Sequence, residues 1–148
     1  MVNQIHLTVA VVVERKGRFL MVREIRNGLE LYNQPAGHVE PGETPIEAAI
    51  RETLEETTWH VVPTAIISFT TFRAPANDIT YYRLAFAADA DQLDPLQVID
   101  PDIEEAMWLT YEEILQKRQQ LRSPMVLEAI EDYRRGIFYS LDLLKTHR

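Results

Sequence analysis

The order of apolar and polar residues predicts strands in several parts of the chain. Residues 7–13 are almost all apolar and mostly β-branched, which is typical of a strand buried on both faces. The polar turn at 14–17 leads into residues 18–24, which are predicted to return as the second strand of a hairpin. The same signals predict shorter strands at 29–32, 66–72, 81–87 and 106–109. Between the strands we expect turns or irregular chain at 26–28, 33–43 and 74–78.

One helix has clear start signals. Thr44, Pro45 and Glu47 combine an N-cap hydroxyl, a proline at the first helical position and a glutamate three residues after the cap. The residues that follow recur at a spacing of about 3.6, which predicts one buried face. That face consists of Ile46, Ala49, Ile50, Thr53 and Leu54.

Two more helices are predicted near the C-terminus. One starts at the capping box formed by Thr110 and Glu113 and runs to about residue 119. The other starts at Ser123 and stops at Gly136, with one inward face made by Val126, Leu127, Ile130 and Tyr133. Residues 137–148 carry no clear pattern. Strands that alternate with three helices predict an α/β sandwich around a mixed β-sheet.

The composition is that of one ordinary domain. The chain has 148 residues, 46% of them hydrophobic, which is enough for a substantial core. Its 23 acidic and 15 basic residues give a formal net charge of −8, which argues against nucleic-acid partners. The absence of cysteine excludes disulfides, zinc–thiolate sites and a cysteine nucleophile. The apolar run at 9–13 is far below the ~18 residues of a membrane span. We therefore expect a soluble, cytoplasmic protein without membrane contact, either a monomer or a homodimer.

Three glutamates crowd one face of the first predicted helix. Glu52, Glu55 and Glu56 are spaced i, i+3 and i+4, so they lie side by side and repel one another. Carboxylate oxygens suit a hard divalent ion, Mg²⁺ or Mn²⁺, which would offset that repulsion and also bind phosphate. Glu43 and Arg51 are near enough in sequence to orient these ligands. Taken alone, such a cluster is more often a solvated, glutamate-rich helix surface.

The spacing around this cluster resembles the signature of the Nudix hydrolases. Counting from Gly37, five residues precede Glu43 and seven more precede Arg51, which opens the string Arg-Glu-Thr-Leu-Glu-Glu. The family pattern is Gly-x5-Glu-x7-Arg-Glu-U-x-Glu-Glu-x-Gly-U, where U is a bulky aliphatic residue. Every charged position matches, and the spacing is unbroken across a loop and a helix.

Three positions depart from this pattern: Thr53, Thr58 and Trp59 replace an aliphatic residue, a glycine and an aliphatic residue. Thr58 matters most, because that glycine normally ends the helix in a left-handed conformation that is costly for a β-branched residue. We expect either a strained left-handed end at Thr58 or a helix that continues through it. Since the charged set is intact, the departures concern local geometry and not the chemistry.

The resemblance implies a single Nudix domain over residues 1–148, with the Nudix-type α/β/α sandwich and the signature at 37–59. It implies four oxygen ligands for the metal: the Gly37 carbonyl and the carboxylates of Glu52, Glu55 and Glu56. Glu52 is also implied to orient or deprotonate the attacking water. A further catalytic carboxylate on a late loop is implied, for which Glu105 and Glu104 are alternatives, since only one of two adjacent strand residues faces the site.

Shorter strings at 33–38, 102–108 and 121–124 are similar to the NudJ-type phosphatases of this family. They imply hydrolysis of nucleoside di- and triphosphates and of small diphosphate esters such as hydroxymethylpyrimidine diphosphate, with release of phosphate. Arg23 is a candidate phosphate ligand, although a surface charge explains it as well. Gln34 is a candidate hydrogen-bond partner for a base or pyrimidine ring, although a turn-stabilising amide is equally consistent.

Three other functions are alternatives to phosphatase activity. A housecleaning nucleoside triphosphate pyrophosphohydrolase shares the signature and differs in which phosphorus is attacked. A metal-dependent isomerase of allylic diphosphates needs a cysteine or comparable acid, and the chain has no cysteine. A nucleotide-sensing module without catalysis typically loses carboxylates of the signature, and here all are present.

Overall fold

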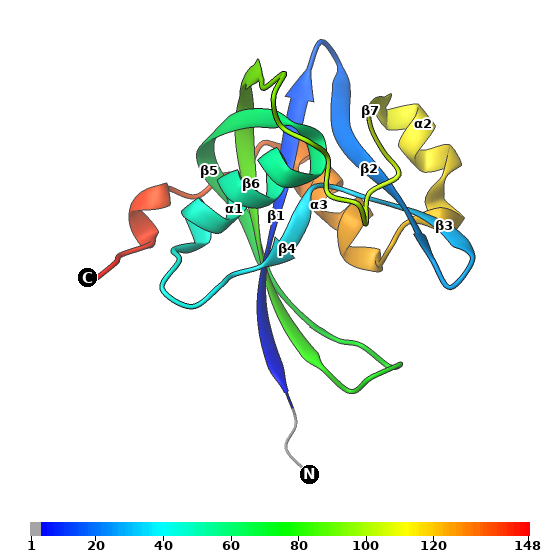
Figure 1. Cartoon of the computed structure of the whole chain (residues 1–148). Coiled ribbons are helices and arrows are strands. Elements are labelled where there is room, and N and C mark those ends of the chain that lie inside the picture. Colours follow the sequence, from blue (N-terminus) through cyan, green and yellow to red (C-terminus); the bar gives the residue numbers. More distant parts are fainter. Residues whose placement is uncertain (1–3) are drawn as a thin grey trace.

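The computed structural model describes residues 4–148, in which a seven-stranded sheet lies among helices (Figure 1). The strands are β1 (Ile5–Arg15), β2 (Arg18–Arg26), β3 (Leu29–Asn33), β4 (Ala36–His38), β5 (Trp59–Arg73), β6 (Thr80–Leu93) and β7 (Glu105–Thr110). The α-helices are α1 (Pro45–Thr57), α2 (Tyr111–Gln116) and α3 (Pro124–Arg135). Two 3₁₀ turns follow the second and third helices, η1 (Arg118–Gln120) and η2 (Leu141–Leu143).

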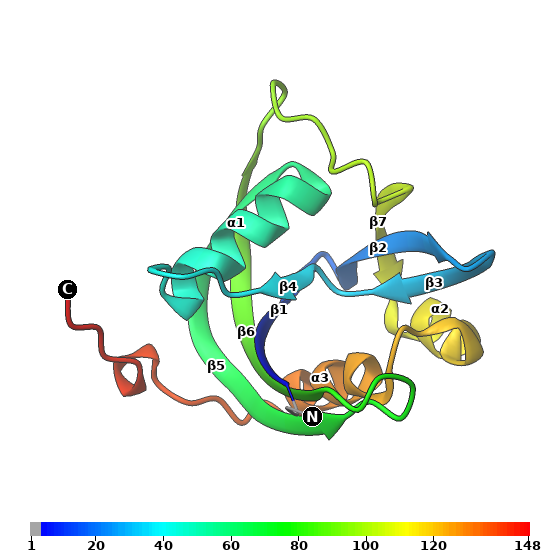
Figure 2. The same cartoon turned by 60° about the horizontal axis from the view of Figure 1, so that its bottom comes forward.

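The sheet has two halves that share little backbone pairing. Its strand order is β3-β2-β1-β6-β5, with β4 paired to β1 and β7 paired to β2. β1 and β6 run parallel, whereas the other pairs are antiparallel. β1 and β2 pair only next to their connecting turn, at Glu14–Phe19 and Arg15–Arg18, and then diverge (Figures 1 and 2). Because β3 pairs with β2 and β4 pairs with β1, residues 33–36 cross from one half to the other.

Helices cover both faces of the sheet, as the alternation along β1 shows. Val9 and Val11 belong to a buried cluster that includes residues of α1. The intervening Ala10 and Val12 belong to a second cluster that includes residues of α2 and α3. The fold is therefore an α/β/α sandwich around a mixed sheet, which confirms the fold class predicted from the sequence.

The first helix begins as predicted but turns a different face to the core. The Thr44 hydroxyl accepts a hydrogen bond from the Glu47 amide at 3.1 Å, and the Glu47 carboxylate accepts one from the Thr44 amide at 2.9 Å. The aliphatic stripe expected inward is only partly buried at Ile50 and Leu54. The buried residues of α1 are Ala48, Ala49, Thr53, Glu56 and Thr57.

The face of α1 that is buried carries alanines, which are small, and threonines whose hydroxyls hydrogen-bond within the helix. Ala48 and Ala49 allow the helix to lie close to the sheet. The Thr53 and Thr57 hydroxyls donate to carbonyls one turn earlier, at 2.8 and 2.6 Å, so both side chains are buried without an unpaired donor. This rotation also brings Glu56 inward.

Several strand boundaries differ from the prediction. β5 begins at Trp59, directly after α1, whereas the apolar pattern predicted a start at residue 66. Register shifts at 60–61, 63–65 and 66–68 interrupt the alternation of apolar and polar residues along β5. The first half of the strand therefore cannot be predicted from that alternation. β6 extends to Leu93, and the segment predicted as irregular contains the short β4. α2 ends at Gln116, earlier than predicted, and continues as η1.

The end of α1 is left-handed. Thr58 has φ 65° and ψ 12°, and its amide donates to the Leu54 carbonyl at 2.9 Å. Of the two expectations for this position, the left-handed end is the one observed. α3 ends in the same way at Gly136, with φ 75°, a conformation that glycine adopts without steric cost. None of the helices in residues 4–148 is long and apolar enough to cross a lipid bilayer.

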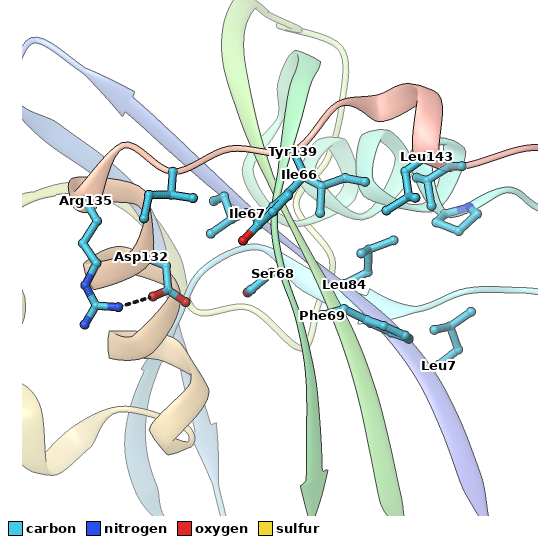
Figure 3. Close-up of a pocket in the computed structure, with 13 residues that line it drawn as sticks. Leu7, Ile66, Ile67, Ser68, Phe69, Leu84, Asp132, Arg135, Tyr139 and Leu143 are labelled. Atoms are coloured by element: carbon cyan, nitrogen blue, oxygen red, sulfur yellow. Dashed lines mark hydrogen bonds and ion pairs between the residues drawn. The ribbon is translucent and has the colours of Figure 1, made fainter.

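A cavity of about 740 Å³ lies between β5, α3 and the C-terminal segment (Figure 3). Its lining is mostly apolar, with the Asp132–Arg135 ion pair at the α3 end. Tyr139 anchors the C-terminal segment through two backbone hydrogen bonds to Ile66, at 2.8 and 2.9 Å. None of the site residues predicted from the sequence lines this cavity, so the candidate site lies elsewhere.

Candidate functional site

Arg51 is the centre of the acidic cluster on α1. Its Nε and Nη2 atoms donate to both carboxylate oxygens of Glu43, at 2.6 and 2.9 Å. Its Nη1 atom donates to Glu52 at 2.8 Å and to Glu55 at 2.9 Å. Nη2 also reaches the His38 carbonyl at 3.1 Å, which ties α1 to the end of β4. One guanidinium thus holds three of the carboxylates in the signature.

These contacts set the protonation of the cluster. Hydrogen bonds from Arg51 lower the pKa of Glu43, which keeps that carboxylate ionised. Those same bonds, above all the one to Glu43, raise the pKa of Arg51 further above its ordinary value. Glu52 behaves differently, since burial raises its pKa despite the bond to Arg51.

Glu56 faces inward, away from Arg51, and is the most buried of the three clustered glutamates. Its carboxylate accepts a hydrogen bond from the Ala36 amide at 3.0 Å. Burial raises the pKa of Glu56 to about 9, and the amide opposes this shift only in part. The charges of Glu52, Glu24 and Asp100 reinforce it. Burial is therefore the main reason that the charged form of Glu56 is disfavoured, and the neighbouring carboxylates add to this effect.

Gly37 lies directly against Glu52. A Cβ atom built on Gly37 would stand 2.2 Å from Cδ of Glu52 and 2.4 and 2.5 Å from its two oxygens. Real Cβ contacts are essentially never this short, so any side chain at position 37 would push the Glu52 carboxylate out of its present place. The two residues predicted to share a metal, one through a carbonyl and one through a carboxylate, are in contact.

The donor set fits a divalent cation. Carboxylate oxygens that lie beside the backbone of a glycine, in a partly buried acidic cluster, are the ligand type that a hard divalent cation prefers. Burial raises the pKa values of Glu52 and Glu56, so a bound cation would stabilise their charged forms. Across residues 4–148, however, no three acidic or histidine side chains converge on one metal position. Glu52 and Glu55 face Arg51, whereas Glu56 faces the Ala36 amide, so the side chains would turn to bind an ion.

Arg23 and Glu105 face each other across β2 and β7. They are register partners, and Arg23 Nη2 lies 3.4 Å from Glu105 Oε1. Glu104 precedes the strand, is exposed, and donates its amide hydrogen to the Arg23 carbonyl at 2.9 Å.

Asp100 is a further acidic residue near the site that the sequence pattern did not predict. Its charge raises the pKa of both Glu52 and Glu56. Its amide donates to the Glu55 carbonyl at 2.8 Å.

Gln34 is placed differently from the prediction. Its side chain is fully buried, with Nε2 donating to the Val126 carbonyl at 2.6 Å and Oε1 accepting from Arg83 at 3.1 Å. Both ends of the amide are therefore used inside the protein. We correct the expectation that Gln34 hydrogen-bonds a substrate ring, because such a contact would break a buried bond.

The structure reveals three charged residues that the sequence analysis did not single out. Glu24 is buried in β2 and accepts hydrogen bonds from Arg122 at 2.6 Å and from Arg26 at 3.1 Å. Arg83 is buried in β6 and lies near Arg122. Glu24 and Arg83 each interrupt an apolar strand sequence, which is a signal that could have found them.

Comparison with known proteins identifies the family. The model of the NUDIX domain matches residues 4–129, which includes the whole signature. The chain belongs to the Nudix hydrolases. Phosphatase NudJ of Escherichia coli K12 is 44% identical over 94% of this Nudix chain and 90% of its own length. Phosphatase NudJ of Shigella sonnei has the same identity and coverage.

Solved Nudix structures agree with this assignment. A Nudix hydrolase from Nitrosomonas europaea superimposes with a TM-score of 0.94 at 38% identity, covering 97% of this chain and 98% of that one. A MutT protein from Methanosarcina mazei Go1 has a TM-score of 0.72 at 22% identity, over 92% of this chain and 98% of that one. The second likeness shows only that the fold is shared. The chain is therefore a hydrolase of the Nudix type.

Proposed function

We propose that this Nudix hydrolase uses a divalent metal to hydrolyse phosphoric anhydride bonds in nucleoside di- and triphosphates and small diphosphate esters. The observation that carries the proposal is the contact of the partly buried Glu52 carboxylate with the Gly37 backbone, beside the buried Glu56 carboxyl. Such a site is costly to maintain in a protein that binds no cation. The 44% identity to Phosphatase NudJ supports a phosphatase activity in particular.

The metal that we propose is Mg²⁺, with Mn²⁺ as a substitute. Its ligands would be the Gly37 carbonyl and the carboxylates of Glu52, Glu55 and Glu56. When bound, a divalent ion neutralises phosphate oxygens and lowers the pKa of a coordinated water. A cation between protein and substrate also explains how a chain with a net charge of −8 can bind polyphosphates.

The remaining roles belong to the side chains of the chain itself. Glu52 accepts the proton of the attacking water, for which its raised pKa is suited. Arg51 fixes the position of the Glu52 carboxylate by a hydrogen bond, and Glu43 fixes the position of Arg51 in the same way. For the late-segment carboxylate we propose Asp100 as a candidate beside Glu105 and Glu104, because its charge raises the pKa of both Glu52 and Glu56. Arg23 remains a proposed phosphate ligand, which would exchange Glu105 for the substrate.

The substrate range is proposed to be broad. Since both ends of the Gln34 amide are used internally, this residue contributes no contact to a particular ring. A site with few specific polar contacts separates rings of similar size by only ~1–3 kcal/mol. We therefore expect several nucleoside di- and triphosphates and hydroxymethylpyrimidine diphosphate to be hydrolysed, with attack at the terminal phosphorus.

Hydrolysis in ¹⁸O-labelled water tests the proposal. With a nucleoside triphosphate and Mg²⁺, we expect label in inorganic phosphate and an unlabelled nucleoside diphosphate. Label in a nucleoside monophosphate, with pyrophosphate as co-product, would instead identify a housecleaning pyrophosphohydrolase. No Mg²⁺-dependent turnover across the whole substrate panel would refute the catalytic proposal and favour a nucleotide-sensing module.

A further inference from the structure

Residues 33–37 join the two halves of the sheet and carry the backbone of the site. Contacts from several parts of the molecule hold these residues in place. The Pro35 carbonyl accepts from the Val11 amide at 3.0 Å, and the Ala36 amide donates to Glu56. Gly37 then abuts Glu52. The position of this segment therefore sets how the backbone meets two carboxylates of the site.

Arg83 holds the beginning of the same segment. Its Nη2 atom donates to Oδ1 of Asn33 at 3.0 Å and to Oε1 of Gln34 at 3.1 Å. Its Nη1 atom donates to the Met125 carbonyl at 3.3 Å, in the first turn of α3. The Gln34 amide completes the link by donating to the Val126 carbonyl. One side chain thus fastens the segment to both β6 and α3.

The chemistry of this contact is unusual. Arg83 is only 5% exposed, yet all three of its hydrogen-bond acceptors are neutral oxygens. A buried cation that no carboxylate hydrogen-bonds is costly, and burial together with the positive charge of Arg122 lowers the pKa of Arg83, which the charge of Glu128 offsets only in part. On the same face of β6 the next positions are Ala85 and Ala87, which are apolar and buried. An apolar residue at 83 would avoid the penalty, but it could not supply a planar fork of donors.

We infer that Arg83 is a positioning residue for the active site. Through Asn33 and Gln34 it fixes residues 33–37, so that the Ala36 amide and the Gly37 backbone meet Glu56 and Glu52 in the geometry required to bind the metal. The inference rests on the proposed function, because it assumes that these groups form the metal site. It explains why a buried guanidinium lies where stability alone favours an apolar side chain.

Three variants separate positioning from stability. Arg83→Met removes the charge and the donors at similar length, and Arg83→Lys keeps the charge with fewer donors. Arg135→Met is the matched control, since it removes a cation that is 68% exposed on α3. For each protein we would measure the melting temperature, kcat and KM, and the affinity for Mn²⁺ by electron paramagnetic resonance without substrate.

For Arg83→Met, well below its melting temperature, we expect at least tenfold losses in kcat and in Mn²⁺ affinity, with KM changed less than threefold. Arg83→Lys should recover part of both losses, and Arg135→Met should resemble the wild type. A lower melting temperature with unchanged kcat and Mn²⁺ affinity would mean that Arg83 only stabilises the fold, which overturns the inference. A rise in KM alone would mean that Arg83 binds substrate, which overturns it as well.

Gln34→Leu gives a second route if Arg83→Met does not fold. Because Arg83 is inferred to act through Gln34 together with Asn33, Gln34→Leu should also weaken Mn²⁺ binding, and adding Arg83→Lys should reduce it by less than the product of the two separate losses. Losses that multiply in the double variant would refute the pathway. Wild-type turnover with Mg²⁺, measured alongside, tells the two proposals apart: an active wild type with unaffected variants removes only the inference about Arg83.

Discussion

Replacing Thr58 with glycine should stabilise the protein. Thr58 adopts φ 65° and ψ 12° at the end of α1, where a β-branched residue is strained. Its amide donates to the Leu54 carbonyl at 2.9 Å, and its carbonyl accepts from the Asp94 amide at 2.8 Å. Both bonds belong to the backbone and survive the substitution. Among the residues that the structure describes, the Thr58 side chain has no hydrogen-bond partner that glycine would remove.

The magnitude follows from two opposing contributions. A left-handed conformation costs a residue with a side chain ~1–2 kcal/mol. Relief of this strain stabilises the folded protein. Glycine also makes the unfolded chain more flexible, which lowers the free energy of unfolding by ~0.4–1 kcal/mol. The net gain in the free energy of unfolding is therefore about 1 kcal/mol, which corresponds to about 3–4 °C in the melting temperature of a chain of this length.

Thermal and urea denaturation of the metal-free protein measure the effect, and Gly136→Ala is the matched control. Gly136 ends α3 with φ 75°, and a Cβ there would meet nothing within 4 Å, so its replacement adds no steric clash and involves the same two contributions with opposite signs. It should lower the melting temperature by about as much as Thr58→Gly raises it. If Gly136→Ala destabilises and Thr58→Gly does not stabilise, strain at Thr58 is not the dominant contribution there.

Two further substitutions examine the carboxylates. Glu56→Gln should lower kcat by about 100-fold or more, by comparison with other catalytic groups. Because the pKa of Glu56 is raised from 4.5 to about 9, the metal-free fold keeps a proton there that the unfolded chain releases, and stability falls as pH rises from about 5 to 9. Between pH 5 and 9 the melting temperature should fall less for Glu56→Gln than for the wild type. Equal dependence of the melting temperature on pH in the two proteins would contradict the raised pKa. Gly37→Ala should leave the fold intact but displace the Glu52 carboxylate, 2.2 Å from the new Cβ, and abolish Mn²⁺ binding. Mn²⁺ affinity within threefold of the wild type would show that Gly37 and Glu52 do not share the ion.

The features that the sequence predicted are those with local causes. The capping boxes at Thr44 and Thr110 are formed by residues three apart, and both are present in the structure. The strand predicted at residues 7–13 lies within β1, and its continuous apolar run predicts the section that is buried, residues 9–13, although Leu7 is exposed. Family spacing likewise predicted which elements carry the acidic cluster, because loop length and helical period together determine where each charge falls.

The features that were missed depend on distant partners. β4 is three residues long and exists only because β1 lies beside it. Gln34 was expected at the site, but its acceptor at Val126 is 92 residues away in the sequence. The Arg122–Glu24 ion pair spans 98 residues. No periodicity within a short window records such contacts, so they appear only once the two halves of the sheet and α3 are assembled.

The metal-free fold tolerates three adjacent glutamates by two different means. Arg51 neutralises Glu52 and Glu55 through hydrogen bonds of 2.8 and 2.9 Å, which is the compensation that their spacing on one helix requires. Glu56 accepts its hydrogen bond from the Ala36 amide and not from Arg51, and burial raises its pKa to about 9, which favours the neutral carboxyl. In the proposed metal site, binding of a divalent ion would require Glu56 to lose its proton, and Glu52 and Glu55 to exchange the Arg51 guanidinium for the ion. Arg51 would stay in place during that exchange, because its two bonds to Glu43 do not involve Glu52 or Glu55.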